Sequence, residues 1–71
     1  MASEWLTVRQ VTDQVQAAGY PDSVDTIRRR VDRGEFGARG QDWYRSESGY
    51  RYVQPAAVHE FLRRRAAQRE E

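Results

Sequence analysis

Two short amphipathic stretches, separated by a single tight turn, constrain the fold of this chain more than any other feature. Residues 6–18 and residues 23–33 each repeat apolar side chains at the spacing of one helix face. These side chains are Val8, Val11, Val15 and Ala18 in the first stretch and Val24, Ile27 and Val31 in the second. The four residues Gly19-Tyr20-Pro21-Asp22 between them are rich in turn formers. The pattern predicts two helices joined by a tight turn, with their apolar sides sharing one small core.

Both predicted helices carry end signals. Thr7 followed by Gln10 gives the capping box T-x-x-Q, in which each side chain bonds the backbone N–H of the other residue. Ser23, or alternatively Asp22, is the expected N-cap of the second helix, and Gly34 is its expected end.

The chain after residue 34 changes to glycines and aromatic residues. Residues 41–46 and 50–53 are predicted to form two short strands joined across Glu47-Ser48-Gly49. A hairpin is not stable alone, so an aromatic face must pack on the helices. The candidates for that face are Trp43, Tyr50 and Tyr52. The inward side of each strand stays open, because a slip of one residue in register inverts it.

Pro55 suits the first position of a third helix. The predicted buried stripe of this helix consists of Ala57, Val58, Phe61, Leu62 and Ala66. The last turns carry arginines that suit a helix C-terminus electrostatically, Arg63, Arg64, Arg65 and Arg69. Those at residues 63–65 are expected to be solvated, and the alternative is that they contact phosphate or a partner protein. The fold class is therefore predicted to be mainly α with a small β-hairpin, in the order helix, turn, helix, hairpin, helix.

Seventy-one residues suffice for one domain with one core, so we expect a single domain over residues 1–71, ordered from about residue 5 to about residue 66. A domain of this size usually needs a covalent or metal staple, or a partner. The absence of cysteine excludes disulfides and thiolate metal sites, and the single histidine, His59, excludes a zinc site built from imidazoles. Association with copies of itself or with a ligand such as DNA remains.

The sequence holds no signal for export, membrane insertion or catalysis. No uninterrupted apolar run exceeds three residues, and the N-terminus lacks a basic region followed by an apolar one, so we expect a cytoplasmic protein. Ser46 and Ser48 have no base nearby in the sequence, and the acidic residues show no paired spacing. His59 is expected on the surface. The chain is therefore expected to be no enzyme and to use no cofactor.

Basic charge is concentrated in the middle of the chain. The net charge is only +1, but residues 23–65 hold ten arginines against six acidic residues, a local balance of +4. All twelve basic residues are arginine. A GC-rich genome accounts for much of this preference, and the guanidinium fork also suits bidentate contacts to phosphate and guanine.

The polar residues of the second helix lie opposite its apolar stripe. At 100° per residue, the outer side carries Thr26, Arg29 and Arg33, with Asp25 and Arg28 alongside and Arg30 nearer the buried edge. A major groove about 12 Å wide admits one helix, so the outer side is expected to reach base edges. Asp25 suits a cytosine amino group, and Arg28 and Arg30 suit the flanking phosphates. The alternative is a solvated face in which Asp25 pairs with Arg29.

The hairpin strengthens the DNA-binding interpretation. A β-ribbon beside such a helix can lay a basic side chain into the adjacent minor groove. Arg45 and Arg51 flank the predicted turn and are the candidates, with Arg39 a weaker one. The alternative is that they are exposed strand residues that prevent pairing with neighbouring molecules. Together with the helix pair, these residues favour a winged helix-turn-helix fold.

The order of these segments resembles the excisionase family of phages and integrative elements. The resemblance rests on L-T-V-x-Q-V at residues 6–11, S-x-D-T-I-R-R at residues 23–29, G-E-F at residues 34–36 and A-V-x-x-F-L at residues 57–62. It covers residues 6 to about 65, and S-x-D-T-I-R-R, which other small MerR-like regulators share, is its most specific part. The chain departs from the family at Arg30, where a bulky apolar residue is usual, and in the longer connection at residues 37–44.

The resemblance implies a MerR-like winged-helix fold, DNA contacts from Asp25, Thr26, Arg28 and Arg29, and a wing arginine in the minor groove. The full set assigned to DNA is Ser23, Asp25, Thr26, Arg28, Arg29, Arg30 and Arg33 on the helix and Arg39, Arg45 and Arg51 on the wing. Family members bind attachment-site DNA in neighbouring copies, bend it and direct an integrase towards excision, without catalysing anything. The implied partners are therefore double-stranded DNA, further copies of the chain on that DNA, and an integrase.

Two other functions stay open at this point. A small MerR-like transcriptional regulator would use the same surface on a promoter. A protein-interaction module would instead dock the basic face onto an acidic partner.

Overall fold

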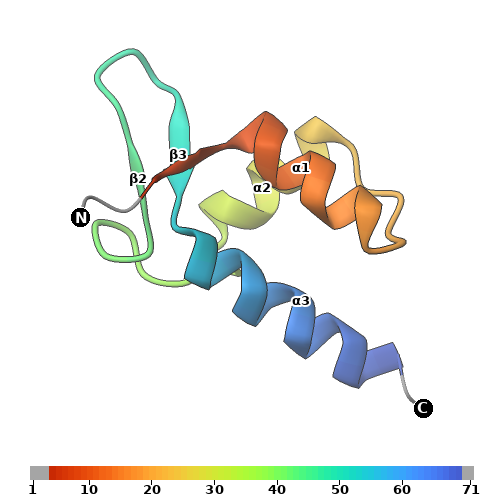
Figure 1. Cartoon of the computed structure of the whole chain (residues 1–71). Helices are drawn as coiled ribbons and strands as arrows, with labels where there is room; N and C mark the ends of the chain where they lie inside the picture. The colour runs from red at the N-terminus through yellow and green to blue at the C-terminus, as the bar shows by residue number, and fades with distance from the viewer. Residues whose placement is uncertain (1–3, 70–71) are drawn as a thin grey trace.

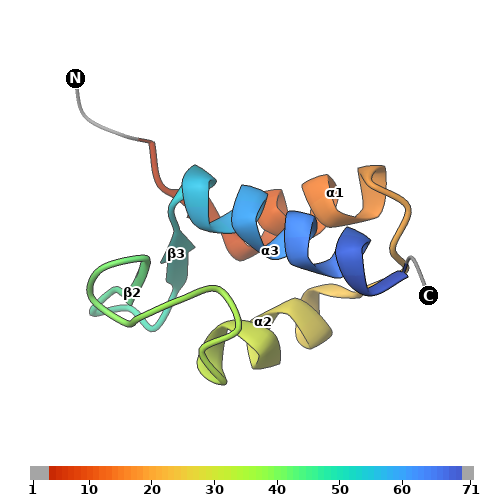
Figure 2. The ribbon, with the colours of Figure 1, turned by 90° about the horizontal axis from the view of Figure 1, so that it is seen from below.

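The computed structural model describes residues 4–69, and this part of the chain forms three helices and a three-stranded antiparallel sheet (Figure 1). The elements in chain order are β1 (Leu6–Thr7), α1 (Val8–Ala17), α2 (Val24–Asp32), β2 (Trp43–Arg45), β3 (Arg51–Val53) and α3 (Pro55–Arg69). Figures 1 and 2 show the helices gathered together and the hairpin of β2 and β3 extending away from them. The helix-and-hairpin order predicted from the sequence is present.

The start of α1 is set by the predicted capping box. The Thr7 hydroxyl accepts a hydrogen bond from the Gln10 backbone N–H (3.1 Å), and the Gln10 side-chain oxygen accepts one from the Thr7 backbone N–H (2.9 Å). Because an N-cap residue has extended backbone, Leu6 and Thr7 continue as a strand and pair with β3. The prediction of a helix over residues 6–18 was wrong at both ends, since α1 covers Val8–Ala17 and Ala18, its C-cap, is exposed.

The second helix also begins at its predicted cap. The Ser23 hydroxyl accepts a hydrogen bond from the Thr26 backbone N–H (3.2 Å), and Gly34, with a φ of +83°, follows the last turn. Ile27 and Val31 are fully buried, as predicted. Val24, the first residue of α2, was also expected on the apolar side but is 36% exposed.

The register of the sheet decides which aromatic side chains reach the core. Trp43 lies opposite Val53, and the next pair along the strands is Tyr44 with Tyr52. Alternate residues of a strand face opposite sides, so Trp43 and Val53 are buried against the helices and Tyr52 is not. The predicted inward position of Trp43 is confirmed. The predicted inward positions of Tyr52 and Tyr50 were wrong. Tyr52 stacks on Tyr44 across the outer face, with ring centroids 5.2 Å apart, and Tyr50 is 67% exposed.

The third helix closes the core. It begins at Pro55, as predicted, and buries Ala57, Val58 and Phe61. The Phe61 ring stacks on that of Phe36 with centroids 4.2 Å apart. Ala66, which was expected in the stripe, is exposed. None of the helices within residues 4–69 is long and apolar enough to cross a membrane.

Candidate nucleic-acid interface

The outer face of α2, made of Asp25, Arg28, Arg29 and Arg33, is open to solvent. The side chains of Arg28 and Arg33 are 45% and 65% exposed. Among residues 4–69, no side chain forms a hydrogen bond or an ion pair with the exposed guanidinium of Arg29. Ile27 and Val31 anchor the opposite side of the helix, so these cations stand on a fixed support.

The first turn of α2 uses part of its polar chemistry internally. Arg28 pairs with Asp25 (2.8 Å), one turn earlier, in place of the Asp25–Arg29 pair considered from the sequence. The hydroxyls of Ser23 and Thr26 lie 3.1 Å apart. Both hydroxyls are therefore engaged at the helix cap, and the exposed charge of α2 lies mainly in Arg29 and Arg33.

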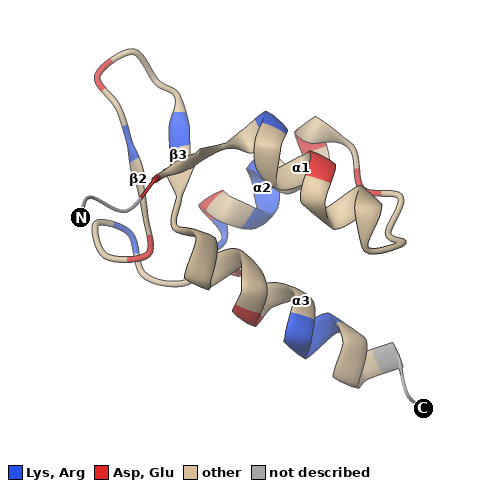
Figure 3. Ribbon diagram, viewed as in Figure 1, with Lys and Arg blue, Asp and Glu red and all other residues tan. Residues whose placement is uncertain are grey.

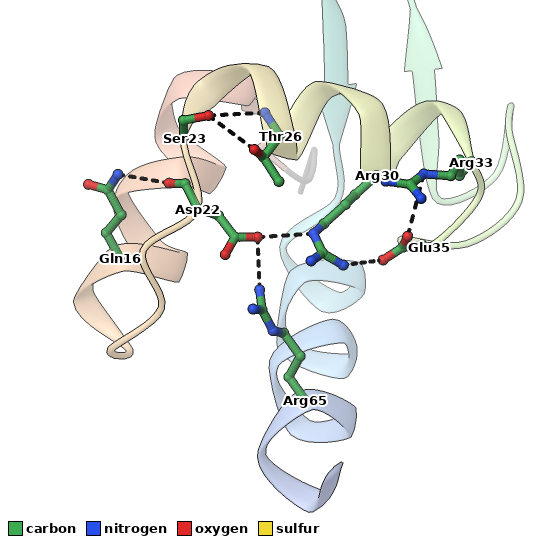
Figure 4. A network of polar contacts seen from close by, with 8 residues as sticks. All are labelled: Gln16, Asp22, Ser23, Thr26, Arg30, Arg33, Glu35 and Arg65. Atoms are coloured by element: carbon green, nitrogen blue, oxygen red, sulfur yellow. Dashed lines mark hydrogen bonds and ion pairs between the residues drawn. The ribbon is translucent and has the colours of Figure 1, made fainter. Parts of the chain in front are cut away.

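Arg30 does not lie on the outer face. Its Nε donates to Asp22 Oδ2 (3.0 Å) and its Nη1 to Glu35 Oε1 (2.7 Å), as Figure 4 shows. The hydrogen bond with Glu35 raises the pKa of Arg30 above its ordinary value, against a smaller opposing effect of burial. The sequence assigned Arg30 to a phosphate contact, but its helix position turns the guanidinium towards the turn and α3, where two carboxylates hold it.

Asp22 is the centre of this network, although from the sequence it was expected only in the turn or as a helix cap. Its side chain is 6% exposed and also accepts a hydrogen bond from Arg65 Nη1 (2.9 Å), while its backbone carbonyl accepts one from Gln16 Nε2 (2.9 Å) (Figure 4). The Arg65 guanidinium lies over the Tyr20 ring, 4.2 Å from its centroid. The expectation that Arg65 is solvated was therefore wrong. Asp22 joins α1, α2 and α3 at one point.

The hairpin arginines also separate into two kinds. Arg51 donates from Nε and Nη2 to the two carboxylate oxygens of Asp32 (2.6 and 2.9 Å), and its side chain is only 13% exposed. This contact, with the nearby charges of Arg51, Arg45 and Arg28, holds the pKa of Asp32 below its usual value. Arg51 was assigned to the minor groove, but it is used to tie β3 to α2.

Arg45, the cross-strand neighbour of Arg51, is exposed. Within residues 4–69 its side chain takes part in no hydrogen bond or ion pair. Arg39 is exposed on the loop before β2, with its guanidinium 5.7 Å from the centroid of the Trp43 ring. Figure 3 shows that the basic positions of β2, β3 and this loop lie on the same side of the molecule as the end of α2.

Within residues 4–69, no three His, Asp or Glu side chains are grouped so that they could hold a metal ion. His59 is exposed on α3, as predicted.

No protein family, curated protein or solved structure matches this chain in sequence or structure comparison.

Proposed function

We propose that the chain is a winged helix-turn-helix DNA-binding protein. In this proposal α1, the turn and α2 form the helix-turn-helix, α2 enters the major groove, and the β2–β3 hairpin is the wing. The support comes from the short turn between two helices that share a core, and from the hairpin that extends beside them. The family resemblance of residues 6–65 points in the same direction.

The observation that carries the proposal is the exposed guanidinium of Arg29, which has no partner within residues 4–69 and lies opposite the buried side of α2. A guanidinium in this position can donate two hydrogen bonds to O6 and N7 of a guanine, the commonest specific contact in the major groove. Arg28 and Arg33 flank it along the helix and suit the phosphates at the groove edges. A long arginine on a rigid helix loses less conformational freedom on binding than one on a mobile loop.

The biological role we propose is that of an excisionase. The protein binds attachment-site DNA cooperatively, bends it and directs an integrase towards excision, without catalysing a reaction itself. The resemblance of S-x-D-T-I-R-R and the flanking segments to excisionases supports this role. A small domain whose single contact surface is modest gains affinity when copies bind side by side on the same DNA.

The test is a mobility-shift titration on the DNA that flanks the encoding element, with a circular-permutation assay for bending. Stepwise complexes of increasing size and a bend are expected. Affinity should also fall about a thousandfold between 50 and 200 mM salt if about six phosphates are contacted. Arg63→Gln is a matched control, because Arg63 is exposed on α3 and paired only with Glu60.

Other outcomes assign the other functions. A single complex at a promoter, without bending at attachment sites, favours the transcriptional regulator. If no duplex is bound at 50 mM salt, the proposal is refuted, and an acidic protein becomes the expected partner of the basic face.

A further inference from the structure

Three arginines from successive segments of the chain line one pocket beside α2. Arg33 comes from the C-terminal end of α2, Arg39 from the loop before β2 and Arg45 from the end of β2. The pocket has a volume of about 390 Å³, and Asp32, Trp43 and the backbone of two glycines complete its lining. All three arginines are exposed, so their guanidinium groups can be reached from solvent. We refer to it as the arginine pocket.

The loop that presents Arg39 is held by several bonds. Trp43 Nε1 donates to the Gly37 carbonyl (3.2 Å), and the Asp42 carboxylate accepts from the Ala38 backbone N–H (2.8 Å). At the other end of the loop, the Gly40 N–H donates to the Trp43 carbonyl (2.6 Å). Since the Trp43 side chain is itself buried, Arg39 stands on a support that is continuous with the core.

The positive charge of the arginine pocket is not neutralised from within the described part of the chain. Its one acidic residue, Asp32, already receives two hydrogen bonds from Arg51. Arg33 has only a long contact to Glu35 (3.7 Å), and within residues 4–69 neither Arg39 nor Arg45 has a carboxylate partner. Guanidinium groups that share a pocket repel one another, and an anion between them removes that repulsion.

Three of the last backbone carbonyls of α2, those of Arg29, Arg30 and Val31, are already paired beside the pocket. The last carbonyls of the helix accept hydrogen bonds from the N–H groups of Arg33, Gly34 and Glu35, each near 3.0 Å. These bonds satisfy carbonyls that a helix end otherwise leaves unpaired. The lining of the pocket holds three guanidinium groups against one carboxylate, that of Asp32, and its formal charge is therefore positive.

We propose that the arginine pocket binds one phosphate of the DNA backbone, with Arg33, Arg39 and Arg45 converging on that phosphate. This inference rests on the proposed DNA-binding function and deepens it, because it assigns these hairpin-side arginines to positioning and not to reading the minor groove. Planar guanidinium forks bind phosphate oxygens in pairs and fix orientation as well as charge. A phosphate held beside the end of α2 would set the angle at which Arg29 meets the bases.

Salt titrations of variants test whether the three arginines share one phosphate. Binding to one duplex is measured at several salt concentrations for the unaltered protein and for the variant R33Q/R39Q/R45Q. The plot of log affinity against log salt concentration should be less steep for the variant by about 0.9, since one phosphate contact is lost. Three separate contacts would lower the steepness by about 2.7, which would overturn the proposal. The loss of affinity should be equal on A·T-rich and G·C-rich flanks. A loss confined to A·T-rich flanks would assign these arginines to the minor groove instead. Arg63→Gln is again the control.

A second measurement on the unaltered protein does not depend on any DNA target. NMR of the arginine side-chain Nε–Hε groups during titration with inorganic phosphate should shift Arg33, Arg39 and Arg45 together and leave Arg63 unchanged. If the three signals do not shift together, the arginine pocket is overturned, even if the protein binds duplex DNA. If they shift together but no duplex is bound, the oxyanion site is supported and only the DNA-binding function is refuted. If a short DNA duplex shifts the signals of the same three arginines, the DNA backbone is the source of the bound phosphate. If only free phosphate shifts them, the proposal that the pocket binds the DNA backbone is overturned.

Discussion

Asp22, Arg30, Glu35 and Arg65 form one network of charged side chains. Replacing Asp22 by asparagine should lower the stability of the fold more than any other single change within this network. The substitution keeps the size of the side chain and removes its charge. Arg30 and Arg65 would then share a neutral amide oxygen in place of the carboxylate oxygen Oδ2, so both of their charge-assisted hydrogen bonds are weakened. The two guanidinium groups would also repel each other without a carboxylate between them.

The expected cost follows from the contacts. A net hydrogen bond to a charged group contributes about 1.5–3 kcal/mol when it is buried. The side chains of Arg30 and Arg65 are 27% and 22% exposed, so water compensates part of the loss and the lower end of that range applies. We expect the free energy of unfolding of Asp22→Asn to fall by about 2 kcal/mol. For a domain of this size that corresponds to a Tm lower by about 8–16 °C.

Thermal unfolding followed by circular dichroism measures this shift. Asp13→Asn is the matched control, because Asp13 is an exposed acid of α1 for which residues 4–69 provide no ion pair or hydrogen bond. A Tm decrease of less than about 2 °C, or one equal to that of the control, would show that the network adds nothing to the fold. A double-mutant cycle with Arg65→Met should also give a coupling energy of about 1 kcal/mol or more.

Four other changes have defined outcomes. Arg29→Ala should cost about 1–3 kcal/mol of specific DNA binding and relax preference at one base pair without altering Tm, and unchanged preference in a binding-site selection would remove Arg29 as a base reader. Arg30→Met should lower Tm while leaving the salt slope of DNA binding unchanged, and a lower slope would return Arg30 to the phosphate contacts. Gly37→Ala should cost about 2 kcal/mol or more in urea unfolding, because a φ of +122° strains an alanine and the new Cβ would meet a neighbouring carboxylate. Because the pKa of Asp32 is lowered in the folded state, its bond with Arg51 stabilises the fold fully above about pH 4. This stabilisation is lost as the pH falls through the lowered pKa, so Asp32→Asn should make Tm depend less steeply on pH in acid.

Local signals predicted the residues that cap or open the three helices. The Thr7 capping box, the Ser23 cap and Pro55 each act within one turn of their own position, so the sequence alone contains the whole interaction. Helical spacing likewise identified Ile27 and Val31 as buried, because the geometry of one helix fixes which residues share a face.

The register of the sheet could not be predicted in the same way. Whether Trp43 or Tyr44 faces the core depends on which residue of β3 lies opposite, and the sequence of neither strand alone determines this. Both strands are rich in residues that suit either face. The third strand, Leu6–Thr7, was missed because two residues give no alternating pattern, and its existence follows from pairing with a partner about 45 residues later in the chain.

The candidate site was predicted only where its geometry depends on one helix, and not where it depends on partners in other segments. The exposure of Arg28, Arg29 and Arg33 followed from the helix wheel. The diversion of Arg30 into the fold did not, since its partners are Asp22 in the turn and Glu35 beyond the helix. The position of Arg30 near the buried edge of the stripe was the one available signal.

The arginines of residues 4–68 divide by what holds them, and the division explains how a small fold without disulfides can fix the orientation of α2. Arg30, Arg51 and Arg65 each bond a carboxylate on another segment, and together they tie α2 to the hairpin and the turn to α3. The sequence suggested that association with a partner must supply the stability that disulfides and metals do not. Guanidinium ties across elements are a further source, because each restrains two segments as a staple does. Excisionases usually have a bulky apolar residue at the position of Arg30, and such a residue could make only apolar contacts. Arg30 instead lies near the Phe61 ring, 5.9 Å from its centroid, and forms two ion pairs. Loss of DNA binding in an arginine variant therefore assigns a contact only when Tm is unchanged.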